Sequence, residues 1–370
     1  MANSQRFIAL DVFRGMTLCL MIIVNTPGDG AHTFEPLNHA KWHGFTLTDL
    51  VFPSFLFAVG NSISFAQQKW ISKTNREILF VILKRTALIF ILGFLMYWFP
   101  FFTLTDTKQI IISPISETRI MGVLQRIAIC YGIASLLIQF LKIKISLIIG
   151  ILCLFVYWGI LYSFGDYTLP GNAVLKFDNW LMGENHLYRG EGIPFDPEGW
   201  LSTMPAIANV IAGYWVGKRI QQRKKEEGLL LKLIFIGISL ILLAYLWNFL
   251  LPINKKLWTS SFVLVTIGWD CMILSTIVYL TQILPTTKWT YFFEVFGKNT
   301  IFIYLLSELV VVVVGMIPIS SNLNLFEWLY RYFFSIPGLY IGSLLFSVTY
   351  MLFCWSIGYL LDQKKIYIRV

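Results

Sequence analysis

Charged residues are scarce in this sequence. Only 13% of its 370 residues are Asp, Glu, Lys or Arg, whereas 57% are apolar, and this charged fraction is roughly half that of an average soluble domain. A soluble protein of this length needs polar residues to cover its surface, so the composition excludes an ordinary soluble enzyme. The net charge is +9, but the basic residues stand in short clusters between apolar runs. That arrangement reflects membrane topology and argues against a nucleic-acid partner.

Cysteine and recognisable processing signals are also few. No two cysteines form a CxxC pair, and all five fall inside apolar segments: Cys19, Cys130, Cys153, Cys271 and Cys354. The sequence therefore predicts neither a disulfide framework nor a zinc site, and no metal is expected. The N-terminal MANSQRF lacks a small-residue cleavage site, so the first apolar segment is expected to remain as a span. Without a linker of disordered composition or a short-period repeat, residues 1–370 are expected to form a single transmembrane domain.

Apolar runs of about bilayer length recur from end to end. They predict an all-α, polytopic membrane helix bundle of about ten transmembrane helices. The expected spans are residues 7–27, 47–67, 78–99, 119–140, 145–164, 200–217, 229–250, 259–283, 297–316 and 338–361.

The basic residues of alternate loops fall on one side of these spans. They are Lys69, Lys73, Arg76, Lys142, Lys144, Lys218, Arg219, Arg223, Lys224, Lys225, Lys288, Lys364, Lys365 and Arg369. By the positive-inside rule this side is cytoplasmic, so both termini are expected in the cytoplasm and the protein in the inner membrane as a multi-pass protein. The outer loops, 28–46, 100–118, 165–199, 251–258 and 317–337, should face the periplasm, or a lumen in a eukaryote.

Histidines gather on the outer side, and one of them has a promising sequence context. His39 lies in the first outer loop and Asp49 at the outer mouth of the second span, so a loop that folds back would bring the two within hydrogen-bonding distance. A carboxylate that holds one imidazole nitrogen leaves the other to accept a proton, as a general base requires. His43 competes for this role. Asn25, at the outer end of the first span, offers an amide to a ligand or acts as a helix cap.

Ionisable residues inside spans are costly and need a reason. Asp11 and Arg14 are spaced for an ion pair on the first span, and Lys84 and Arg85 lie within the third. These four residues form either structural salt bridges or a cytoplasmic site for the phosphates of an anionic ligand such as a nucleotide or coenzyme.

Three further ionisable residues indicate a polar cavity through the bundle: Arg126, Asp270 and Glu308. The pattern fits an enzyme that takes a charged donor from the cytoplasm and an acceptor from outside. It fits equally a transporter whose polar residues line a path. Composition does not separate the two.

Several blocks, taken in order, resemble the membrane core of the heparan-alpha-glucosaminide N-acetyltransferase family, which includes bacterial homologues. They are RFIALDVFRGMTLCLMIIVN, NHAKWHGFTLTDLVFPSFLFAVGNSI, GVLQRIAICY, FDPEGWLSTMPAI, PINKKLWTSSFVL and GKNTIFIY. The resemblance covers nearly all of the sequence. It implies acetyl transfer across a membrane, with acetyl-CoA supplied on the cytoplasmic face and a terminal glucosamine amine acetylated on the other.

The resemblance also implies roles for individual residues. His39 matches the essential histidine, Asp49 its partner, and Asn25 the asparagine that closes the first helix. The residues expected to bind the donor are Asp11, Arg14, Lys84, Arg85, Arg126 and Asn299. The ninth-span block departs from the lysosomal enzyme, because Ser307 stands where that enzyme has a histidine before glutamate.

The resulting hypothesis is an acetyl-CoA-dependent N-acetyltransferase acting on an amino sugar, or on a glycan with terminal glucosamine, at the periplasmic side of the lipid bilayer. His39 would act as general base or as transient acetyl carrier. The alternative is an inner-membrane transporter of an N-acetylated amino sugar, with Asp11, Arg126, Asp270 and Glu308 along its route. The sequence leaves a homodimer open.

Overall fold

The computed structural model describes residues 7–104, 109–222, 227–284, 287–320 and 323–368. Its helices are α1 (Ile8–Asn25), α2 (Leu47–Ala66), α3 (Asn75–Trp98), α4 (Val123–Phe140), α5 (Ile143–Phe164), α6 (Ala173–Met182), α7 (Thr203–Gln222), α8 (Glu227–Trp247), α9 (Ser260–Val278), α10 (Thr290–Lys298), α11 (Thr300–Gly315), α12 (Leu325–Leu329) and α13 (Leu339–Gln363). Two small hairpins, β1 (Phe102–Leu104) with β2 (Ile110–Ile112) and β3 (Pro318–Ser320) with β4 (Leu323–Asn324), are both antiparallel.

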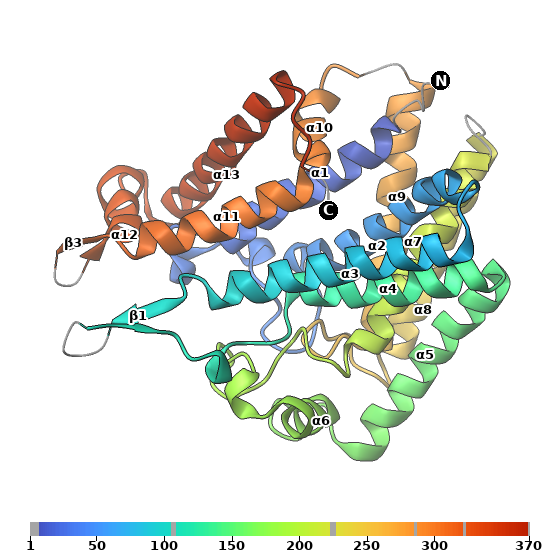
Figure 1. Ribbon diagram of the computed structural model, residues 1–370, viewed down its shortest axis with the longest axis horizontal. Helices are drawn as coiled ribbons and strands as arrows, with labels where there is room; N and C mark the ends of the chain where they lie inside the picture. Colours follow the sequence, from blue (N-terminus) through green and yellow to red (C-terminus); the bar gives the residue numbers. More distant parts are fainter. Residues whose placement is uncertain (1–6, 105–108, 223–226, 285–286, 321–322, 369–370) are drawn as a thin grey trace. The chain divides into compact units, whose positions relative to one another are not determined.

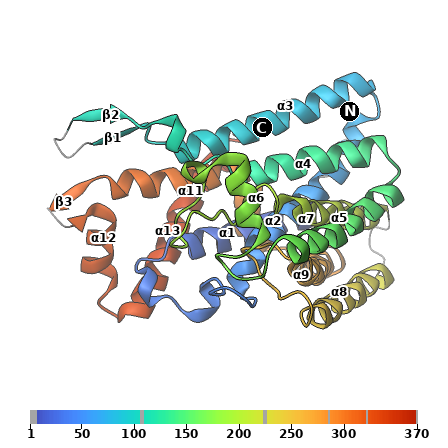
Figure 2. The ribbon, with the colours of Figure 1, turned by 90° about the horizontal axis from the view of Figure 1, so that it is seen from below.

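The helices are distributed over two compact units. Unit 1 comprises residues 1–39, 46–51 and 277–370, and unit 2 comprises residues 40–45 and 52–276. In unit 1, α1 packs against α10, α11 and α13. In unit 2, α3 runs beside α4, and α7 packs against α4 and α5, as the two ribbon views show (Figures 1 and 2). The expectation of a single transmembrane domain stays a prediction.

The all-α polytopic fold class is confirmed, whereas the number of spans differs from the expected ten. Within the described residues, eight helices are long and apolar enough to cross a membrane, or nine if the bent pair α10 and α11 counts as one span. The expected span 200–217 corresponds to α7, which is not among them. Most of α7 is buried against other helices, so it can carry polar residues such as Asn209 and small residues such as Gly213 without exposing them to lipid.

The expected ninth span, 297–316, contains a sharp break. Helices α10 and α11 meet at an angle of 81°. Asn299 lies between them and is both the C-cap of α10 and the N-cap of α11. The buried Asn299 side chain donates to the Ile366 carbonyl at 3.0 Å and accepts from the Ile368 amide at 2.8 Å. Its hydrogen bonds therefore tie the break to the chain after α13, an arrangement that hydropathy does not encode.

Glycines allow close helix contacts in both units. A Cβ at Gly15 of α1 would lie 1.9 Å from the Phe293 carbonyl oxygen of α10, and one at Gly297 would lie 2.1 Å from the Asp11 carbonyl oxygen. A Cβ at Gly60 of α2 would likewise lie 1.9 Å from the Val210 oxygen of α7. Small residues are what membrane helices use to bring their backbones together.

The basic loops of unit 2 gather at one end of that unit. The end of α2, the start of α3, the end of α4 and the end of α7 line one common pocket. This agrees with the placement of the Lys69, Lys142 and Lys218 clusters on one membrane side. Other members of the predicted basic set, Arg223, Lys224, Lys225 and Arg369, lie outside the described residues.

Candidate active site

The structure brings the predicted pair His39 and Asp49 together in unit 1. His39 Nδ1 lies 2.7 Å from Asp49 Oδ1. The side chain of His39 is 41% exposed, whereas that of Asp49 is 1% exposed. A buried carboxylate thus holds one nitrogen of an accessible imidazole. In the tautomer that donates from Nδ1 to the carboxylate, Nε2 carries the lone pair that can accept a proton.

Asp49 is itself fixed by the way α2 begins. Its Oδ2 accepts from the Thr46 backbone N–H at 2.9 Å, while the Asp49 N–H donates to the Thr46 carbonyl at 3.2 Å. Thr46 Oγ1 lies 3.0 Å from the same carboxylate oxygen and 2.7 Å from the Asn38 carbonyl, and its single proton serves one of them at a time. The run Thr46-Leu47-Thr48-Asp49 has the spacing of a helix-capping box. Sequence reasoning missed Thr46, although this spacing is a signal for it.

A second histidine and aspartate pair in unit 1 has a more exposed carboxylate. His32 Nδ1 lies 2.7 Å from Asp29 Oδ2, with side chains that are 33% and 30% exposed. The hydrogen bonds from His32 and from the Ala31 N–H lower the pKa of Asp29. Asp29 is 30% exposed whereas Asp49 is 1% exposed, so water competes for the Asp29 carboxylate more than for that of Asp49.

The rival candidate, His43, has a different neighbour. Its Nδ1 lies 3.4 Å from Asn254 Nδ2, an amide rather than a carboxylate. Partial burial lowers the pKa of His43. The geometry therefore favours His39 over His43 for a charge-stabilised base.

Asn25 pairs with an acidic residue of α11. Its Nδ2 donates to Glu308 Oε1 at 3.2 Å, within unit 1. An amide nitrogen carries two N–H groups, so one donor remains for another acceptor. Asn25 thus contacts Glu308, and His39 contacts Asp49.

The predicted donor-binding residues of unit 1 already have protein partners. Arg14 donates to the buried Asp11 one turn away on α1, as the spacing of the two residues predicted. Asn299 is bound to backbone atoms of residues 366 and 368.

The donor-binding residues predicted in unit 2 lie at different levels of two helices. Lys84 is exposed on α3, and the Arg85 guanidinium sits 4.8 Å from the centre of the Tyr131 ring on α4. Arg126 is fully buried, lies over the Trp258 ring at 4.7 Å and donates to the Gly199 carbonyl at 3.1 Å. The assignment of all six residues to the donor stays a prediction.

A buried ionic network on the predicted outer side was not foreseen. Arg119 donates to both oxygens of Asp196, at 2.8 and 2.6 Å, and to Glu198 Oε2 at 2.7 Å. Beside it, Asp178 of α6 accepts from the Leu201 N–H at 3.1 Å, and burial raises the pKa of Asp178 to about 7. This network joins the loops before α4 and before α7, which are far apart in the sequence.

Asp270, expected on the route of the transporter alternative, accepts a hydrogen bond from Ser54 within unit 2. All five cysteines are unpaired thiols. Among the described residues, no group of three or more His, Cys, Asp or Glu side chains is arranged to hold a metal ion.

Comparison with known proteins gives a consistent result. The sequence model of the family described as "Heparan-alpha-glucosaminide N-acetyltransferase, catalytic" matches residues 6–247. The chain is 26% identical over 363 residues to heparan-alpha-glucosaminide N-acetyltransferase of Homo sapiens, covering 82% of this chain and 53% of that protein. It is 26% identical over 362 residues to the Mus musculus protein of the same name, with the same coverage. The chain thus spans about half the length of the curated relatives it matches.

Proposed function

Because the chain belongs to the heparan-alpha-glucosaminide N-acetyltransferase family, we propose that it is a transmembrane N-acetyltransferase. It moves an acetyl group from cytoplasmic acetyl-CoA to the amine of a glucosamine-type sugar on the periplasmic side of the inner membrane. The observation that carries the proposal is the 2.7 Å contact between the exposed His39 ring and the buried Asp49 carboxylate. Both residues lie inside the region that matches the family.

The chemistry follows from what the acceptor needs. A protonated amine has no lone pair, so the sugar must lose a proton before its nitrogen attacks the thioester carbonyl. Nε2 of His39 accepts that proton, and Asp49 stabilises the imidazolium that forms. The new C–N bond forms as the C–S bond breaks. The electron pair of the C–S bond leaves on the coenzyme A sulfur as a thiolate.

The same ring nitrogen also serves a two-step route. Nε2 of His39 would attack the thioester first, release coenzyme A and carry the acetyl group until the sugar amine takes it. In either route negative charge develops on the carbonyl oxygen. The second N–H of Asn25 is the proposed donor to that oxygen, while the first stays on Glu308.

The test is acetyl transfer by the purified protein. Radiolabelled acetyl-CoA and glucosamine are incubated with it in detergent, and labelled N-acetylglucosamine is expected as product. The matched control is His39→Ala, which removes the proposed base from an exposed loop. If neither protein forms product while vesicles containing the wild type take up N-acetylglucosamine, the enzyme proposal fails and the transporter takes its place.

A further inference from the structure

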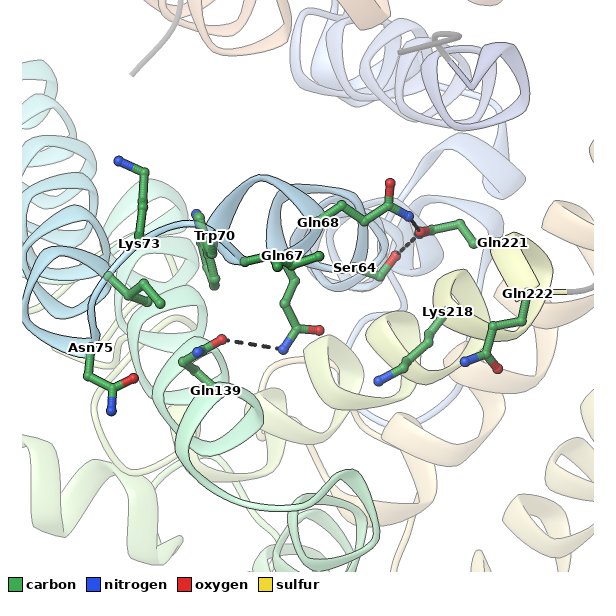
Figure 3. A pocket seen from close by; sticks show the side chains of 12 residues that line it. Ser64, Gln67, Gln68, Trp70, Lys73, Asn75, Gln139, Lys218, Gln221 and Gln222 are labelled. Atoms are coloured by element: carbon green, nitrogen blue, oxygen red, sulfur yellow. Dashed lines mark hydrogen bonds between the residues drawn. The ribbon is translucent and has the colours of Figure 1, made fainter. Parts of the chain in front are cut away.

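A pocket of unit 2 has no role in the chemistry described above. It has a volume of about 600 Å³ and lies where α2 and α4 end, α3 begins and α7 ends. Figure 3 shows its polar side chains around the space between these helices. Its lining residues are Ser64, Gln67, Gln68, Trp70, Ile71, Lys73, Asn75, Ile78, Gln139, Lys218, Gln221 and Gln222. None of them belongs to the predicted donor-binding set.

The chemistry of the lining is specific. Six of the twelve lining residues are Gln or Asn, two are Lys, and none is Asp or Glu. Amides both donate and accept hydrogen bonds, as the edge of a nucleobase and the hydroxyls of a ribose require. The two lysines favour an anionic group such as phosphate. Glu77, outside the lining, feels the charge of Lys73 but is hydrogen-bonded to Thr74 in the cap of α3. A pocket of this volume is within the range of small-molecule and cofactor sites.

Hydrogen bonds hold four of the six amides in place, those of Gln67, Gln68, Gln139 and Gln221. Gln67 donates to Gln139 Oε1 at 3.3 Å and accepts from the Tyr214 hydroxyl, which in turn lies 3.2 Å from Lys218 Nζ. On the other wall, Gln68 donates to Gln221, and Gln221 donates to Ser64. These chains connect the end of α2 and the turn that follows it with α4 and with α7, as a dashed line in Figure 3 shows for the Gln67 and Gln139 pair. This part of the lining is therefore held in place before any ligand binds, which lowers the entropic cost of binding.

The pocket lies among the basic loops that face the cytoplasm under the positive-inside rule. Lys73 belongs to the loop between α2 and α3, and Lys218 to the last turns of α7. A ligand supplied from the cytoplasm would reach it without crossing the membrane. The proposed acetyl donor is such a ligand, and its nucleotide end carries a 3′-phosphate and a diphosphate.

We propose that this pocket binds the phosphorylated adenosine end of the coenzyme A donor. The proposal rests on the proposed function and names the part of the chain that recognises its donor. Lys73 and Lys218 neutralise phosphate charge, and the amides of Gln139 and Gln222 bind the base and the ribose. A lipid phosphate carries the same charge on the same membrane side, but it has no nucleobase to form hydrogen bonds with the amides.

The first experiment measures binding rather than turnover. Unlabelled coenzyme A, 3′-dephospho-coenzyme A and 3′,5′-ADP are titrated into the full chain in nanodiscs of zwitterionic lipid. The double variant Lys73→Gln, Lys218→Gln should weaken coenzyme A binding about tenfold or more, since a lost charged contact exceeds about 1.4 kcal/mol. The matched control, Lys142→Gln with Lys144→Gln, removes two exposed charges at the start of α5 outside the pocket. It should bind coenzyme A as the wild type does.

A second experiment does not depend on removing the lysines. Asn75 lines the pocket and is exposed at the start of α3, so Asn75→Cys should react with a maleimide. Coenzyme A and 3′,5′-ADP should slow that reaction in Asn75→Cys. They should leave the reaction of Lys144→Cys unchanged.

The outcomes separate this inference from the proposed function. If wild type binds coenzyme A but the pocket double variant binds it equally well and Asn75→Cys is not protected, the pocket proposal is wrong while the enzyme proposal stands. If nanodiscs of anionic lipid abolish protection by 3′,5′-ADP, a lipid phosphate is the occupant and the proposal is again wrong. If coenzyme A protects Asn75→Cys from the maleimide but the wild type forms no acetylated sugar, the pocket proposal is supported and the enzyme proposal is refuted.

Discussion

Replacing Asp49 by Asn should impair catalysis more than it impairs the fold. Asp49 Oδ2 accepts from the Thr46 backbone N–H at 2.9 Å, and Oδ1 faces His39 Nδ1 at 2.7 Å. In the Asn variant the side-chain oxygen must stay on the Thr46 N–H, because an amide nitrogen cannot accept that bond. The amide nitrogen then faces His39. Nδ1 would have to accept, and the proton would move to Nε2, the position needed for the base.

The expected loss of transfer rate in Asp49→Asn follows from this change of tautomer. General-base assistance contributes about two to four orders of magnitude, and the wrong tautomer removes most of it. We therefore expect Asp49→Asn to lose a hundredfold or more, roughly, of the transfer rate, though less than His39→Ala. Asp49→Ala should affect stability more than Asp49→Asn does. It leaves the His39 tautomer unconstrained, but it removes the acceptor for the Thr46 N–H. Loss of such a cap costs about 1 kcal/mol of stability.

The assay compares initial rates of acetyl transfer with thermal unfolding in the same detergent. Asp49→Asn should unfold near the wild-type temperature and be nearly inactive, while Asp49→Ala should unfold earlier. His43→Ala and His32→Ala are the controls, and both should keep most of the activity. The reasoning is refuted if His39→Ala stays active, or if His43→Ala or His32→Ala loses as much activity as His39→Ala.

Four further predictions concern topology and stability. A reporter fused to the C-terminus should behave as cytoplasmic, and periplasmic activity there would reverse the orientation. Arg119→Met should destabilise unit 2 by about 3–5 kcal/mol in thermal unfolding, because Asp196 and Glu198 would stay buried without their counter-ion. Gly15→Ala should cost about 1–3 kcal/mol by overpacking, whereas Gly159→Ala, where a Cβ meets nothing within 4 Å, should be neutral or stabilising. The raised pKa of Asp178, about 7 against 3.8, means that its contribution to stability falls as pH rises from about 4 to about 7. Asp178→Asn should therefore flatten the pH dependence of the unfolding temperature in this window, and an unchanged slope would contradict the burial argument.

The pairing of His39 with Asp49 could be predicted because it is nearly local. The residues are ten positions apart, and the later one opens a helix, so a short loop suffices to join them. Asp11 and Arg14 are a similar case, since one helical turn separates them. Asn299 is the opposite case. Its block belongs to the family resemblance, but its hydrogen bonds to residues 366 and 368 depend on the packing of α10, α11 and α13.

The sequence by itself determined the class of fold and the position of most helices, because apolar runs of bilayer length have few alternatives to an α-helix in lipid. It also indicated the family, through blocks that keep their order. Only the tertiary structure decided that α7 is a buried helix of mixed polarity, that Arg119 pairs with Asp196 across 77 positions, and that four helix ends line an amide-rich pocket. Each of these depends on which helices become neighbours. Close backbone contacts at residues such as Gly60 and buried side-chain hydrogen bonds determine which helices pack together. Neither feature produces a periodic pattern in the sequence.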